Sequence, residues 1–131
     1  MAKRILCVSR TIRTVTKGGA DCGVEGVAGS FSPATLAKIF MQFPGHRGVE
    51  LEGLRIFDAG CGFGHIVLAA ALLKAAIACG VELEKNLEAY GPIFTTARNL
   101  LGISPSVANI GFVDLDSVKT LDLYKPNFVT T

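Results

Sequence analysis

Residues 54–64 read LRIFDAGCGFG, an apolar run that leads into an acidic residue and three glycines at every second position. The run predicts a buried strand, and the apolar residues after the glycines predict a helix. Glycine accepts a positive φ and has no Cβ, so a ligand can lie directly against the backbone of such a turn. The first amides of the following helix face the same space and are unpaired. The stretch therefore predicts a ligand-binding turn between a strand and a helix.

The position of Asp58 bears on which ligand fits this turn. Dinucleotide sites favour the spacing G-x-G-x-x-G, whereas Gly60, Gly62 and Gly64 follow G-x-G-x-G. A carboxylate two residues before Gly60 would repel a pyrophosphate, and it suits an ammonium or sulfonium group instead. The backbone amide of Cys61 lies in the same turn and completes the expected binding loop.

Two further acidic positions follow later apolar runs. The run 75–81 ends at Glu82, about 20 positions after the glycines, where a carboxylate can bind ribose hydroxyls. The run 110–113 precedes Asp114, with Asp116 as an alternative ligand contact nearby. Because the carboxyl ends of parallel strands meet at one edge of an open sheet, we expect these acids and Asp58 to face one crevice.

The glycine turn followed by Glu82 resembles motif I and the second-strand acid of the class I S-adenosylmethionine-dependent methyltransferases. The resemblance covers about residues 31–115 and implies an enzyme that binds S-adenosylmethionine. In that family an acid after the third strand contacts the adenine amino group, which is the role implied for Asp114. Catalytic residues stay unassigned, and no spacing of His, Cys, Asp and Glu suggests a metal site. The implied cofactor contacts are Asp58, Gly60, Cys61, Gly62, Gly64, Glu82 and Asp114.

A narrower resemblance concerns the helix after the glycines. The sequence GHIVL at 64–68, with GVE at 80–82 and then Tyr90, resembles the non-SET histone lysine methyltransferases of the disruptor-of-telomeric-silencing type. This resemblance implies a histone lysine as methyl acceptor and a histone or nucleosome as partner. The chain departs from the family pattern where His65 replaces a glutamine, and where segment 31–35 lacks the glutamate of the cofactor-covering loop.

The composition divides the 131 residues into two zones. Residues 1–30 are rich in glycine and contain five Lys and Arg residues before the first acid, Asp21. We expect a disordered basic arm here; the alternatives are an organellar transit peptide or an arm that docks on nucleic acid or a nucleosome. Residues 31–131 form the expected methyltransferase domain. The overall charge of +2 is too small to indicate a nucleic-acid-binding protein by itself.

Alternating apolar runs predict an α/β, doubly wound domain with a mostly parallel sheet. The methyltransferase fold has seven strands, so the expectation is an N-terminal half of that fold, completed by a C-terminal continuation or a partner. Such a half suggests two alternative functions: a non-catalytic cofactor-binding fragment or partner-dependent subunit, and a fragment of an NAD-binding Rossmann oxidoreductase. The expected helices are 33–43, 63–74 and 84–101, and the expected strands are 54–58, 76–82, 108–113 and the beginning of a fourth at 127–131.

Two features bear on where the protein resides. The run 66–83 is apolar apart from Lys74 and Glu82, and a spanning helix would place Lys74 near the bilayer centre at a cost of ~2.5–3.5 kcal/mol. We therefore expect no membrane association. The four cysteines show no C-x-x-C pairing, which favours free thiols in a reducing, intracellular compartment, nuclear or cytoplasmic.

Overall fold

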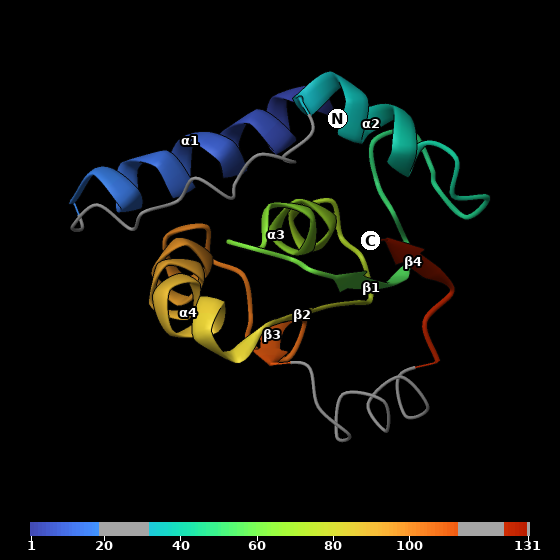
Figure 1. The fold of residues 1–131 in the computed structure, drawn as a ribbon. Coiled ribbons are helices and arrows are strands. Elements are labelled where there is room, and N and C mark those ends of the chain that lie inside the picture. The colour runs from blue at the N-terminus through green and yellow to red at the C-terminus, as the bar shows by residue number, and fades with distance from the viewer. Residues whose placement is uncertain (19–31, 113–124, 131) are drawn as a thin grey trace.

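The computed structural model describes residues 1–18, 32–112 and 125–130. Helices and strands alternate through most of this part of the chain and form an α/β, Rossmann-like unit (Figure 1). The elements are α1 (Ala2–Gly18), α2 (Pro33–Phe40), β1 (Arg55–Ala59), α3 (His65–Leu72), β2 (Ile77–Glu82), α4 (Glu84–Leu100), β3 (Ala108–Phe112) and β4 (Phe128–Thr130).

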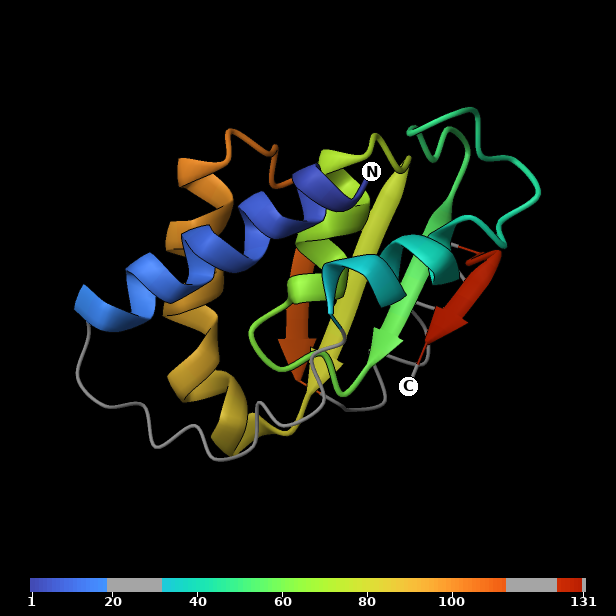
Figure 2. The same ribbon diagram turned by 90° about the horizontal axis from the view of Figure 1, so that it is seen from above.

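The four strands form one sheet in the order β3-β2-β1-β4, and every pairing is parallel. All four strands point the same way in Figure 2. This order matches the first four strands of the doubly wound Rossmann sheet, so the α/β class with a parallel sheet predicted from the sequence is confirmed. The chain moves outward from β1 to β3 and then returns to the opposite side of β1. The carboxyl ends of β1 and β4 are therefore the switch point at which such sheets bind ligands.

The helices pack in two layers over one face of the sheet. In Figure 1, α3 lies directly on the sheet and α4 lies beside it. Helix α1 crosses both of them on the side away from the strands, and α2 packs against α1. Because β1, β2 and β3 follow one another in a single direction, right-handed crossovers put α3 and α4 on the same face. The core between the sheet and these helices contains Ile56, Leu68, Ala78, Phe94 and Ala108, all buried.

The expectation of a disordered arm is wrong for the first part of the chain, which forms α1. Its apolar residues Ile5, Val8 and Ile12 are buried in the core, and their spacing puts them on one helical stripe. The hydroxyls of Thr11 and Thr14 donate to carbonyl oxygens one turn earlier at 2.9 and 3.0 Å. The basic composition drew attention away from the helical spacing of these apolar residues. Packing of that apolar stripe against the rest of the core stabilises the helix. Residues 19–31 lie outside the described part of the chain.

The remaining elements lie close to their predicted ranges. The hydroxyl of Ser32 caps α2 by accepting from the Thr35 amide at 3.2 Å, and Pro33 follows at the first helical position. Helix α3 begins later than predicted because Phe63 and Gly64 belong to the glycine turn. The apolar run 66–83 divides into α3 and β2. Over residues 1–18, 32–112 and 125–130, none of the helices is sufficiently long and apolar to span a bilayer.

Candidate functional site

The turn between β1 and α3 depends on three left-handed glycines. Gly60, Gly62 and Gly64 have φ values of +77°, +57° and +86°, which residues with a Cβ rarely adopt. A Cβ added to Gly60 or Gly62 would meet no atom of the described residues within 4 Å, so these residues leave the surface of the turn open there. A Cβ on Gly64 would instead overlap the ring of Phe94. The first two glycines thus leave room above the turn, and the third lets α4 pack against it.

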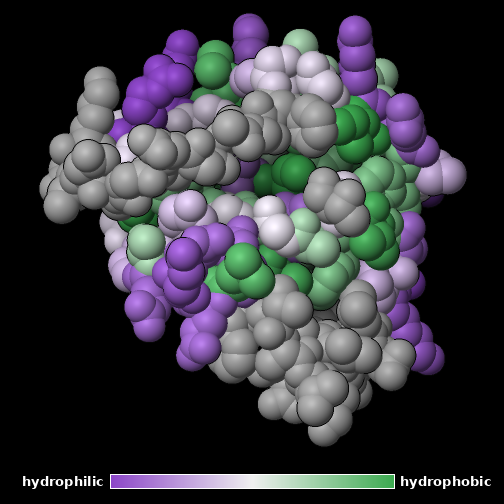
Figure 3. Space-filling view, in the orientation of Figure 1, coloured by the Kyte–Doolittle hydropathy of each residue, from purple (hydrophilic) through white to green (hydrophobic). Residues whose placement is uncertain are grey.

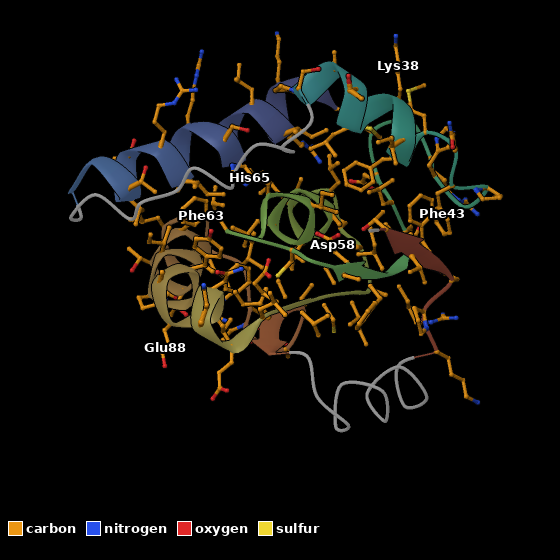
Figure 4. All side chains as sticks on the ribbon, viewed as in Figure 1. Lys38, Phe43, Asp58, Phe63, His65 and Glu88 are labelled. Atoms are coloured by element: carbon orange, nitrogen blue, oxygen red, sulfur yellow. The ribbon has the colours of Figure 1, made fainter. Side chains whose placement is uncertain are left out.

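Asp58 lies on β1 at the start of this turn, between the strand and α3 (Figure 4), and is only 3% exposed. The Thr130 hydroxyl, on β4, donates to its Oδ1 at 2.8 Å. Among the described residues no donor reaches the other oxygen, Oδ2. Burial raises the pKa of Asp58 from 3.8 to about 6, the Thr130 hydrogen bond opposes this rise, and the nearby charge of Glu82 adds to it. A desolvated carboxylate with an oxygen that no described residue contacts favours a cationic partner.

Glu82 ends β2 and is 9% exposed. Its Oε2 accepts from the Gly62 amide at 2.9 Å, and its Oε1 accepts from the Leu83 amide at 2.9 Å and from Asn86 Nδ2 at 3.3 Å. Burial alone raises the pKa of Glu82, but these hydrogen bonds outweigh it and hold the pKa below its usual value. Glu82 is therefore ionised at neutral pH and ties the glycine turn to β2. Its Oε2, with one donor, keeps capacity for another.

The sheet register brings the two carboxylates together. Asp58 lies opposite Gly80 on β2 and opposite Thr130 on β4. Side chains alternate along a strand, so Glu82, two residues beyond Gly80, lies on the same face as Asp58 and at the same edge. The third predicted acid, Asp114, and its alternative Asp116 lie outside the described residues.

Most amides of the turn serve the fold. The Gly60 and Cys61 amides both donate to the Val81 carbonyl, at 2.8 and 3.0 Å. The Cys61 amide was expected to contact the ligand. In the structure it donates to Val81 and so helps to hold the turn on β2. Burial, followed by the charges of Asp58 and Glu82, raises the pKa of the Cys61 thiol to about 12 and keeps it neutral. The amides of Phe63 and His65, which follow in the chain, donate to no acceptor within the described ranges.

Aromatic side chains border the turn on the side of α4. The buried ring of Phe63 packs against Tyr90 with 4.6 Å between ring centroids. Its centroid lies 6.3 Å from that of the His65 ring, in an edge-to-face arrangement (Figure 4). Burial lowers the pKa of His65, so its imidazole is neutral at pH 7. These rings pack together at the entry into α3.

Thr130 and Asn86 are the site residues that sequence reasoning missed. Asn86 lies in the first turn of α4, only four residues after Glu82, so this contact lies within a short stretch of sequence. Thr130 acts on a residue 72 positions away, and only the strand order reveals it.

The arrangement offers charge and hydrogen bonding. In the part of the chain that the structure describes, no group of three His, Cys, Asp or Glu side chains could hold a metal ion. The carboxylates of Asp58 and Glu82 present hydrogen-bond acceptors beside the glycine turn. They suit a ligand with hydroxyls and a positive charge. Comparison of the chain with models of known protein families and with curated proteins finds no match.

Proposed function

We propose that the carboxyl edge of this sheet binds S-adenosylmethionine and that the chain acts as an S-adenosylmethionine-dependent methyltransferase. The observation that carries the proposal is the pair of buried carboxylates, Asp58 and Glu82, on one face and one edge of adjacent strands. Between them lies a glycine turn, and the described part of the chain leaves open space above Gly60 and Gly62. When bound, the cofactor supplies a methyl group activated by its sulfonium.

Asp58 is the proposed contact for the positive charge of the cofactor. Its Oδ1 is held by Thr130 at 2.8 Å, which leaves Oδ2 for an ammonium group. Its burial makes the unpaired ion unfavourable, so a cation that neutralises the carboxylate gains more than it would at an exposed site. A pyrophosphate at the same place would be repelled, which supports this cofactor over a dinucleotide. The amides of Phe63 and His65, at the N-terminus of α3, suit the cofactor carboxylate.

Glu82 is the proposed contact for the ribose. It is ionised and already oriented by Gly62, Leu83 and Asn86, so it needs no rearrangement to accept a ribose hydroxyl. Leu83 follows it with 60% of its surface exposed, and an apolar side chain at that position can cover a flat base. Asp114 is the proposed contact for the adenine amino group.

The proposed methyl acceptor is a protein side chain. A protein lysine, and more narrowly a histone lysine, is supported by the sequence at 64–68 and 80–82, by Tyr90 and by the basic N-terminal segment. The catalytic contribution expected of the chain is orientation and exclusion of water, which methyl transfer from a sulfonium chiefly needs. A cofactor-binding subunit that works with a catalytic partner is the second candidate, because the site described is entirely a cofactor site.

Calorimetric titration with S-adenosylmethionine, S-adenosylhomocysteine and NAD tests the cofactor. We expect binding of the first two, a loss of at least about tenfold for Asp58→Asn, equivalent to ~1.4 kcal/mol, and a smaller loss for Glu82→Gln. Glu88→Gln is the matched control, because Glu88 is exposed on α4 (Figure 4). Binding of NAD without S-adenosylmethionine would overturn the proposal.

Activity is tested separately with radiolabelled cofactor and histones or nucleosomes. Label transferred by the wild type and lost in Asp58→Asn supports a methyltransferase that acts on protein. Cofactor binding without transfer, until a second chain is added, supports the cofactor-binding subunit.

A further inference from the structure

The outer surface of α1 and α2 carries positively charged side chains and no negatively charged ones. Neither helix contains an Asp or Glu, and no ion pair within the described ranges involves these side chains. Figure 3 shows several hydrophilic residues at the upper edge of the molecule, with less polar residues between them, and in Figure 4 Lys38 points away from the body on that side. We call this surface the basic face; its exposed members are Lys3, Arg4, Arg10, Arg13 and Lys38.

The helix presents these charges at fixed positions. Burial of Ile5, Val8 and Ile12 anchors α1 against α3 and α4. Lys3 and Arg10, seven residues apart, fall on one line along the outer side, and Arg13 lies one turn beyond. At ~1.5 Å rise per residue, Lys3 to Arg13 spans about 15 Å. Duplex DNA carries about nine phosphate charges over that length, at one per ~1.7 Å.

We propose that the basic face binds the phosphate backbone of a duplex nucleic acid. Arginine donors in a planar fork match phosphate oxygens, and an array on a rigid helix can contact several phosphates at once. This interaction is independent of the cofactor site and goes beyond the proposed methyl transfer. The charge is local: α1 has five of the 13 Lys and Arg residues and none of the 11 acids.

The packing of α1 argues against a lipid surface as the partner. A helix that lies in a membrane interface buries its apolar side in the lipid. Here that side is buried in the core, and Leu6, at 37% exposure, is the one large apolar residue that the described part of α1 exposes. The basic face therefore offers charge without the apolar surface that membrane binding requires.

Fluorescence anisotropy with a labelled DNA duplex and an RNA duplex of equal length, measured over a salt series, tests the proposal. We expect log K to fall linearly with log salt, by about 0.9 for each phosphate contacted. The variant Lys3→Gln/Arg10→Gln/Arg13→Gln should lose about 2.7 from that slope and bind at least about tenfold more weakly at low salt. Arg10→Lys/Arg13→Lys keeps the charge and should keep the slope.

The matched control is Arg47→Gln/Lys74→Gln/Lys85→Gln, which removes the same charge from exposed positions outside α1 and α2. Circular dichroism establishes that each variant is folded. A loss confined to the α1 variant supports the basic face, and the preferred duplex identifies the nucleic acid. Equal losses in both triple variants, a slope near zero in the wild type, or tighter binding to phosphatidylserine vesicles than to either duplex would each overturn the proposal.

Discussion

Replacing Asp58 with asparagine should stabilise the ligand-free protein. The rise in the pKa of Asp58 from 3.8 to about 6 corresponds to about 3 kcal/mol at ~1.4 kcal/mol per pKa unit. Asparagine is neutral, has nearly the same shape, and can still accept from Thr130. Its amide hydrogens need partners in a buried site, which reduces the gain. We therefore expect the free energy of unfolding at pH 7 to rise by about 1–3 kcal/mol.

The sign of the effect follows from proton binding. The folded chain holds the Asp58 proton more tightly than the unfolded chain, so the contribution of Asp58 to stability is greatest when the group is protonated. That contribution falls as the pH rises from about 4 to about 6. Asp58→Asn should therefore be more stable than the wild type at pH 7 and should lose this advantage near pH 4.

Thermal unfolding followed by circular dichroism measures the difference. An entropy of ~2.1 cal/mol/K per residue makes 1 kcal/mol equal to about 4 °C in Tm for a chain of this length, so the expected rise is roughly 4–11 °C. Thr130→Val is the control in the opposite direction: it removes a hydrogen bond to the charged carboxylate and should lower the Tm at pH 7. An Asp58→Asn protein that is less stable than the wild type at both pH values would refute the reasoning.

Three further outcomes are expected. The affinity for S-adenosylmethionine, measured by calorimetry, should fall as the pH drops below about 6, by up to about tenfold per pH unit, because protonated Asp58 no longer attracts a cation; a flat profile would remove Asp58 from the site. Gly64→Ala should destabilise the protein more in urea unfolding than Gly62→Ala, whose cost is the ~1–2 kcal/mol of left-handed strain alone, since Gly64 also contacts Phe94; equal costs would contradict this packing role. Ile12→Ala should cost about 2–5 kcal/mol in the same assay, whereas a negligible change would mean that α1 is not part of the core.

The sequence was informative where structure is local. The apolar run before Asp58, the glycines after it and the cap at Ser32 each specify their own backbone, and those elements appear within a few residues of the predicted ranges. The edge shared by Asp58 and Glu82 follows from the parallel arrangement of β1 and β2. Both inferences needed only short stretches of chain and the rules of βαβ units.

What sequence reasoning could not find depends on distant contacts. The hydrogen bond of Thr130 to Asp58 exists because β4 pairs with β1, and no local pattern specifies that neighbour. In α1 the error had another cause, since basic and hydroxyl side chains dominate its composition. Its three buried residues gain their stability from α3 and α4, which lie far along the chain, so propensity alone underestimated the helix.

The docking of α1 on α4 also has a consequence for synthesis. Residues 18 and 100, the ends of these two helices, are separated by a stretch that a ribosome translates in roughly 4–16 s at ~5–20 residues per second. During that interval the stripe of Ile5, Val8 and Ile12 lacks the surface that buries it in the folded protein, and a helix of this length is marginal by itself. The nascent chain thus exposes an apolar segment flanked by positive charge for seconds, a natural substrate for chaperones that bind such segments before folding is complete.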